Sequence, residues 1–228
     1  MKFKKIVALV PMRHHSQRVP HKNFRDLAGK PLYTHILDAL AKCSLINEIV
    51  VDTDSPTIKE GIRDAFPSIT VLDRPPELCA DTVPMNEILF YDTEQVQADL
   101  YLQTHSTNPL LRSETIQEAL TVFTTSYPAY DSLFSVTRLQ TRLWDGLARP
   151  LNHNPNILLQ TQDLPPVYEE NSCIYIFTRE TLLKKRTRIG ERPYLFEIDA
   201  LQAQDIDEEQ DFLIADLLKK YHAQNELL

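Results

Sequence analysis

The chain has 228 residues, of which 43% are hydrophobic and 25% are charged, and these ordinary globular values exclude a disordered or collagen-like chain. Its formal net charge of −8 argues against general binding to nucleic acid or to an anionic membrane. The three cysteines contain no Cys-x-x-Cys pair, and no apolar run reaches the ~18 residues of a membrane span. We therefore expect a reducing, cytoplasmic setting, with neither nucleic acid nor membrane as a partner.

Strands and helices are predicted to alternate over residues 5–137. Short apolar runs predict strands at 6–10, 49–51, 69–72, 100–102 and 132–136. Apolar spacing and capping signals predict helices that begin at Leu32, at Ser55-Pro56, at Met85 and at Ser113. This alternation implies right-handed βαβ units and a three-layer α/β/α fold around a mostly parallel sheet, with ligands beyond the carboxyl ends of the strands.

Residues 138–170 interrupt this alternation with four prolines, Trp144 and a cluster of asparagines. We interpret them as an inserted arm, either a lid or a dimer contact, within a single domain spanning 1–228. A strand at 173–177 and a final amphipathic helix at 207–221 are expected after the arm. The basic residues at 184–192 are expected at the solvated end of a helix.

The loop after the first predicted strand carries Arg13, Arg18 and Lys22 within ten residues. Charge at the end of a buried strand is costly unless an anion binds there. Arginine forks and a lysine point charge suit phosphate oxygens. Either this loop binds phosphate, or it is a solvated loop with spare charges.

An acidic run contains Asp205 and Asp207, which share one side if the backbone is extended. Two such carboxylates suit Mg²⁺, which takes a few carboxylates together with substrate phosphates. The alternative is that they only favour the first turn of the following helix.

Two further loops at predicted strand ends carry polar groups. Arg74, in a proline-stiffened loop, could hold a base or a phosphate, or could only form a turn with Glu77. The stretch from Gln103 to Asn108 suits a base or a sugar, or caps the helix at Ser113.

Together these features resemble the CMP-sugar synthetases, the acylneuraminate and Kdo cytidylyltransferases. The resemblance rests on these ordered motifs: Arg13-x-x-Ser16-x-Arg18-x-Pro20-x-Lys22-Asn23, Arg74-Pro-Pro-Glu-Leu, Ala80-Asp81-Thr82, Leu102-Gln103, Asn171-Ser-Cys-Ile-Tyr175 and Asp205-Ile-Asp207. His21 replaces a glycine that is common in the family, and the family's version of the fifth motif reads N-G-A-I-Y.

The resemblance implies a magnesium-dependent transfer of CMP from CTP to the anomeric hydroxyl of a 2-keto-3-deoxy sugar acid, on a nucleotidyltransferase fold. Arg13, Arg18 and Lys22 would be catalytic, acting on the phosphates, and Asp205 and Asp207 would hold Mg²⁺. The implied nucleotide-binding residues are Ser16, Asn23, Arg74, Asp81 and Gln103. The sugar-side candidates are Arg142, Gln162, Tyr168, Glu169 and Asn171. The arm at 138–170 would pack on a second copy and make a homodimer.

One stretch departs from the family. In sialate enzymes arginines precede N-G-A-I-Y and clamp the sugar carboxylate, whereas here Glu169 and Glu170 precede Asn171 and would repel it. Either Arg138 or Arg142 supplies the clamp, or the sugar bears a cationic or neutral group at this place. The rival functions are a catalytically silent nucleotide-sugar binding protein and a transferase for another sugar or nucleotide.

Overall fold

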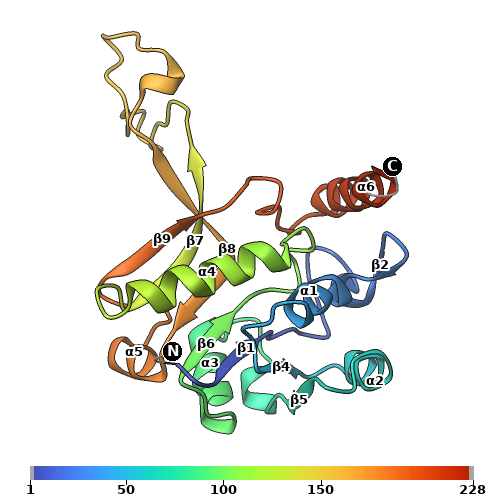
Figure 1. Cartoon of the computed structure of the whole chain (residues 1–228). Coiled ribbons are helices and arrows are strands. Elements are labelled where there is room, and N and C mark those ends of the chain that lie inside the picture. The colour runs from blue at the N-terminus through green and yellow to red at the C-terminus, as the bar shows by residue number, and fades with distance from the viewer. Residues whose placement is uncertain (1–2, 226–228) are drawn as a thin grey trace.

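The computed structural model describes residues 3–225 and places seven of its strands in one sheet (Figure 1). In spatial order these are β5 (Thr70–Asp73), β4 (Glu48–Thr53), β1 (Ile6–Leu9), β6 (Leu100–Gln103), β8 (Val167–Phe177), β7 (Ser132–Leu139) and β9 (Pro193–Glu197). Only β8 runs antiparallel to its neighbours, and the other pairs are parallel. The prediction of a mostly parallel sheet is therefore confirmed.

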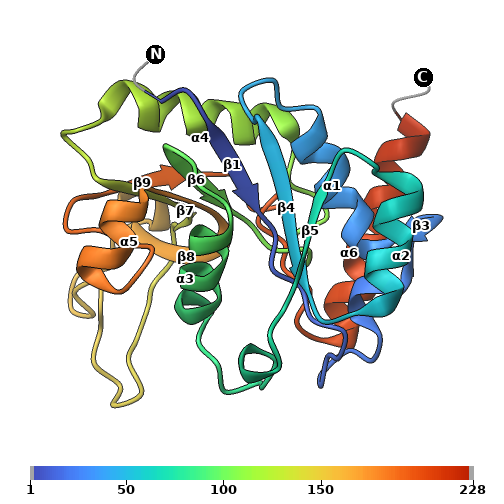
Figure 2. The same cartoon turned by 90° about the horizontal axis from the view of Figure 1, so that it is seen from below.

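Helices cover both faces of the sheet and make the three predicted layers (Figure 2). One face holds α1 (Leu32–Ala41), α2 (Pro56–Ala65) and α4 (Ser113–Ser126), and the other holds α3 (Met85–Gln95) and α5 (Arg179–Lys185). In β1, Ile6 and Ala8 pack with the first group, whereas Val7 and Leu9 pack with the second. A strand that is buried on both faces has no polar alternation, which is why this segment is a continuous apolar run.

Local signals place the helix boundaries. The Ser55 hydroxyl accepts a hydrogen bond from the backbone N–H of Ile58 at 3.3 Å, and Pro56 occupies the first position of α2, as predicted. The last helix, α6 (Glu209–Asn225), begins two residues later than predicted. Ile206 is buried, and the Asp211 carboxylate accepts the backbone N–H groups of Asp207 and Glu208.

The C-terminal helix α6 packs against the segment that follows β1. A small hairpin of β2 (Asp26–Leu27) and β3 (Lys30–Pro31) turns at Gly29, whose φ of 91° suits glycine. Leu27 packs with Ile206 and Phe212 in a separate apolar cluster. This packing brings the segment 205–207 beside the loop after β1.

The arm leaves the sheet between β7 and β8 and projects away from the molecule (Figure 1). The two strands pair as far as Leu139 and Val167, so β8 begins six residues before the predicted strand at 173–177. The loop beyond them exposes Leu147 and Leu158, which are 74% and 88% accessible. Among residues 3–225, no helix is long and apolar enough to cross a membrane.

Candidate functional site

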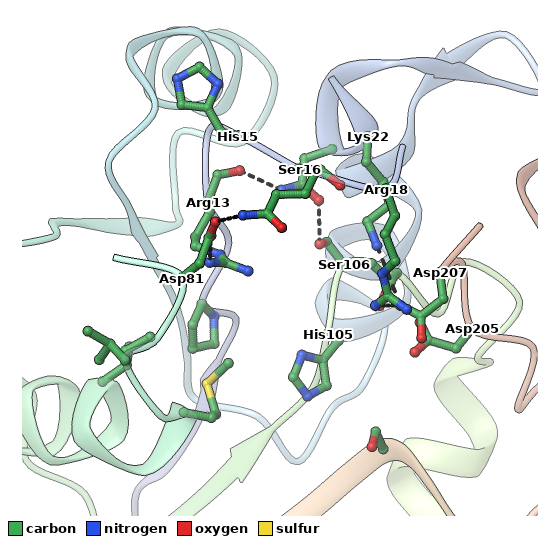
Figure 3. Close-up of a pocket in the computed structure, with 18 of the residues that line it drawn as sticks. Arg13, His15, Ser16, Arg18, Lys22, Asp81, His105, Ser106, Asp205 and Asp207 are labelled. Carbon is green, nitrogen blue, oxygen red and sulfur yellow. Dashed lines mark hydrogen bonds and ion pairs between the residues drawn. The ribbon is translucent and has the colours of Figure 1, made fainter. Parts of the chain in front are cut away.

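A pocket of about 570 Å³ lies at the carboxyl ends of β1, β5 and β6, where a parallel sheet places its ligands (Figure 3). Loops far apart in the sequence meet there. The pocket is lined by these predicted site residues: Arg13, Ser16, Arg18, Lys22, Asn23, Arg74, Asp81, Asp205 and Asp207.

The loop after β1 is held in place by hydrogen bonds at both of its ends. The backbone N–H of His14 donates to Asp54 at 2.7 Å, next to the start of α2. The Asn23 amide donates to the Arg13 carbonyl at 2.7 Å and accepts from the Ser106 hydroxyl at 2.7 Å. Asn23, just inside the 3-10 turn η1 (Lys22–Phe24), therefore fixes the loop's closed shape and its position against the loop after β6.

Each cation of this loop faces a carboxylate or a carbonyl across the pocket. Arg13 pairs with Asp81. Arg18 pairs with Asp207, and the Lys22 ammonium donates to the carbonyl of Ile206. The cations are therefore already gathered on one wall, where an incoming polyphosphate could exchange with these carboxylates.

Asp205 differs from Asp207 in its surroundings. Burial raises the pKa of Asp205, although a hydrogen bond from Thr107 opposes this, and its Oδ1 atom is buried with no hydrogen-bond partner among the described residues. Burial also lowers the pKa of Lys22, against the attraction of both aspartates. An orphaned carboxylate oxygen beside a second carboxylate fits a hard divalent cation such as Mg²⁺.

Arg74 is almost fully buried and pairs with Asp52 on β4, not with Glu77. Its Nη1 atom has no hydrogen-bond partner among the described residues. Asp92 on α3 lies against the pair, and burial followed by the charge of Asp52 raises its pKa well above the usual range. Arg74 also lines the pocket, so its wall contains an arginine that is held rigidly by Asp52 and has one donor group still unpartnered.

The residues predicted for the sugar side are not brought together in this pocket. Arg142 donates to the Leu159 carbonyl within the arm, and Gln162 pairs with Gln160 there. The side chains of Tyr168 and Glu169 are exposed. These four and Asn171 do not line the pocket, and neither does the nucleotide-side candidate Gln103.

Asn171 and Gln103 are instead buried and bonded inside the protein. Asn171 accepts from Ser135 at 2.6 Å and donates to Thr137 at 3.0 Å, which joins β8 to β7. Gln103 accepts a hydrogen bond from the guanidinium of Arg188.

Arg188 lines the pocket but was not singled out from the sequence. The expectation that the basic residues at 184–192 are all solvated at a helix end is wrong for this residue, because α5 ends at Lys185 and the next loop folds back. Arg188 is half-buried, with its guanidinium carbon 3.3 Å from the ring centroid of Tyr175. Its neighbours Lys185 and Arg186 are exposed. The order of charges in the sequence does not distinguish Arg188 from these two residues.

His105, Ser106 and Thr107, from the polar stretch after β6, also line the pocket. Burial, reinforced by the charges of Arg188 and Lys22, lowers the pKa of His105 to about 3. The imidazole is therefore neutral at physiological pH and adds no charge to the cationic wall.

Known proteins resemble the chain over most of its length. The family model described as cytidylyltransferase matches residues 7–228. The N-acylneuraminate cytidylyltransferase of Streptococcus agalactiae serotype III is 29% identical over 222 residues, which cover 92% of this chain and 52% of that protein. The CMP-N,N'-diacetyllegionaminic acid synthase of Legionella pneumophila is 30% identical over 200 residues, with coverage of 82% and 84%.

A solved structure of CMP:2-keto-3-deoxy-manno-octonic acid synthetase with CTP shares the fold, with a TM-score of 0.71 at 16% identity, over 96% of this chain and all of that one. The chain spans about half the length of the N-acylneuraminate cytidylyltransferases that it matches. The match over residues 7–228 nonetheless includes every loop of the pocket. The chain belongs to the cytidylyltransferase family and, within it, to the CMP-sugar synthetases.

Proposed function

We propose that the protein transfers CMP from CTP to the anomeric hydroxyl of a 2-keto-3-deoxy sugar acid and releases pyrophosphate. The observation that carries this proposal is the pocket itself. Three phosphate-type cations, two adjacent carboxylates and a buried arginine with an unused donor edge line one cavity. The named relatives that act on sialic and legionaminic acids support the same reaction class.

In this reaction the sugar oxygen forms a bond to the α-phosphorus as the bond from that phosphorus to the pyrophosphate oxygen breaks, and the hydroxyl proton passes to water. Such a step needs positioning and charge stabilisation more than covalent chemistry. Arg13, Arg18 and Lys22 hold the triphosphate and stabilise the charge that grows on the leaving pyrophosphate. To do so, Arg13 gives up Asp81 and Arg18 gives up Asp207.

The remaining nucleotide contacts are assigned by position. Arg74 lines the pocket and has an unpartnered Nη1 donor among the described residues, so it is assigned to the acceptor atoms of the cytosine. Ser16 and Asn23 lie on the same loop as the phosphate cations, and Asn23 keeps that loop closed.

Asp205 and Asp207 are the residues that would hold Mg²⁺. Bound there, the ion would neutralise phosphate charge and lower the pKa of the attacking hydroxyl. Freed from Arg18 by the triphosphate, the Asp207 carboxylate becomes available as a ligand, whereas the buried Asp205 oxygen is available from the start.

We further propose that the arm packs on a second copy of the chain. The arm exposes Trp144, Leu147, Leu151 and Leu158, apolar surface that a partner would cover. Its sugar-side candidates Arg142 and Gln162 are absent from the pocket of their own chain. A homodimer in which each arm reaches the other site would give these residues a role.

The test is pyrophosphate release from CTP with Mg²⁺ across sialic, legionaminic, pseudaminic, Kdo and 8-amino-Kdo acids, with ATP, GTP and UTP as controls. Release that needs CTP and one of these acids is expected. Binding of CTP with no release across the panel would contradict the proposal and favour a binding protein. Release with another nucleotide would move the chain to a different transferase.

A further inference from the structure

Arg188 differs from the other basic residues of the pocket in having no carboxylate partner within the part of the chain that the structure describes. Arg13 pairs with Asp81, Arg18 and Lys22 face Asp207, and Arg74 pairs with Asp52. Among the described residues, no carboxylate forms an ion pair with Arg188. Its polar partner is the neutral side chain of Gln103.

The carboxylate that attracts Arg188 is that of Glu170, and it is hydrogen-bonded to another side chain. Glu170 accepts a hydrogen bond from the hydroxyl of Tyr175, the ring on which Arg188 lies. It attracts Arg188 from a distance and raises the pKa of Arg188, but burial outweighs this attraction and lowers that pKa overall. A half-buried cation without a paired anion is costly in the free protein, so the site is incomplete without an anionic ligand.

The guanidinium is fixed in a definite orientation. Its face is covered by Tyr175, and one Nη1 hydrogen is used by Gln103. Gln103 is itself fixed, because its amide nitrogen donates to the Thr104 carbonyl at 2.9 Å. The backbone N–H of Arg188 donates to Asn86 at 3.2 Å and anchors the loop to α3. The remaining N–H groups form a flat edge, the shape that receives a carboxylate through two parallel hydrogen bonds.

The position separates this arginine from the phosphate cations. Arg13, Arg18 and Lys22 all come from the loop after β1, whereas Arg188 rests on β6 and β8 through Gln103 and Tyr175. Ser172, also from β8, lines the pocket as well. An acceptor bound on this side would lie across the pocket from the loop that takes the triphosphate.

We propose that Arg188 receives the carboxylate of the sugar acid and is the residue that selects an acidic acceptor. This inference rests on the proposed function. In a 2-keto-3-deoxy sugar acid the carboxylate is attached to the anomeric carbon, which also carries the attacking hydroxyl. Holding the carboxylate therefore holds the nucleophile, so Arg188 acts both in specificity and in orientation. No arginine from the arm and no cationic sugar is then needed to offset Glu169 and Glu170.

The test compares a turned-over sugar acid from the panel with its carboxamide, in which the charge is lost and the size is kept. For the unaltered protein, kcat/KM should be roughly 100-fold higher for the acid, the usual worth of a partly buried charge-assisted contact. In Arg188→Gln this ratio should fall below about 10, while the KM for CTP stays within about twofold. The matched control is Arg186→Gln on the same loop, which is exposed and pairs with Glu87, and it should keep the ratio of the unaltered protein.

The other possible outcomes of this experiment contradict either the role of Arg188 or the proposed function. An unchanged acid-to-amide ratio in Arg188→Gln, or a large rise only in the KM for CTP, removes Arg188 from the acceptor site. No pyrophosphate from the unaltered protein with any acid instead overturns the proposed function, and this inference falls with it. If Arg188→Gln does not fold, Arg188→Lys carries the comparison, because an ammonium cannot offer two parallel donors. An unchanged ratio there overturns the proposal equally.

Discussion

Arg18 and Asp207 form an ion pair although 189 residues separate them in the chain. The pair joins the loop after β1 to the segment before α6, and so joins the proposed phosphate site to the proposed metal site. Because both side chains are about half exposed, the pair adds little to stability. It holds Arg18 at the mouth of the pocket, where phosphate oxygens can compete for it.

Arg18→Ala is expected to reduce kcat/KM for CTP by at least about 100-fold, because a charge-assisted contact to phosphate is lost in the transition state. The free energy of unfolding should change by less than about 1 kcal/mol. Steady-state pyrophosphate release and urea denaturation measure the two effects.

Arg25→Ala is the matched control for Arg18→Ala. Arg25 comes from the same segment and also pairs across to the C-terminal region, with Glu209 at 2.6 Å, but it does not line the pocket. Its loss should leave turnover near normal. Equal losses of activity in both variants would mean that Arg18 acts only through loop packing.

The paired aspartates give a prediction about metal dependence. Asp205→Asn and Asp207→Asn should each raise the Mg²⁺ concentration needed for half-maximal turnover by about tenfold or more, because an amide is a weaker ligand for a hard cation. The adjacent Glu208→Gln, which removes an exposed carboxylate outside the pocket, should leave that concentration unchanged. A metal requirement that is the same in all three variants would refute the site.

The buried cluster of Asp92, Asp52 and Arg74 predicts how stability varies with pH. Since the folded pKa of Asp92 is raised above its ordinary value of 3.8, the unfolded chain releases this proton first. Protonated Asp92 makes its full contribution to the free energy of unfolding below about pH 4. This contribution is lost as the pH rises from there through the folded pKa. Each unit by which the pKa of Asp92 is raised corresponds to about 1.4 kcal/mol in the free energy of unfolding.

Asp92→Asn is therefore expected to flatten this pH dependence and to gain stability relative to the unaltered protein at pH 8. Asp52→Asn should instead destabilise by about 3–5 kcal/mol, because it strands the buried Arg74. Urea denaturation at pH 5 and pH 8 measures the stability of both variants and of the parent protein. A constant difference between Asp92→Asn and the parent at both values would show that Asp92 is ionised in the fold.

The sequence predicts most of this fold because the relevant signals are local. The apolar run before Pro11 can be buried on both faces, and Ser55-Pro56 starts a helix by hydrogen bonding within three residues. The sequence did not predict the edge strand β9 (Pro193–Glu197), because its apolar residues form a run of only three with no apolar–polar alternation, and Phe196 is its one buried side chain.

The phosphate and aspartate residues of the pocket could also be anticipated, since they occupy ordered motifs at strand ends. Arg188 could not, because what distinguishes it from Arg186 is a contact with Tyr175 and Gln103, which tertiary folding alone creates. The partner of Arg74 is likewise tertiary. Glu77 is its neighbour in sequence, whereas Asp52 is its neighbour in the sheet.

The arm gives a prediction about assembly. Leu158, which is 88% exposed at the arm, should anchor a second copy, and Leu158→Asp should yield a monomer in light scattering. The monomer should still bind CTP, because no residue of 138–170 lines the pocket among those described. Leu183→Asp, on an exposed position of α5, is the control and should leave the assembly intact. A Leu158→Asp protein with an unchanged mass would mean that the arm is not the interface.

Two positions where the family's motifs carry glycine have left-handed backbone in this chain. His21 has a φ of 57° and Ser172 a φ of 59°, a region that costs an L-residue roughly 1–2 kcal/mol. His21→Gly and Ser172→Gly should therefore each stabilise the fold by about 0.5–1 kcal/mol, after the entropy that glycine adds to the unfolded chain is subtracted. Glu60→Gly, at an exposed helical position of α2, should destabilise by about 1 kcal/mol. Urea denaturation compares the three, and a loss of stability at position 21 or 172 would show that the side chain there contributes more than its backbone conformation costs.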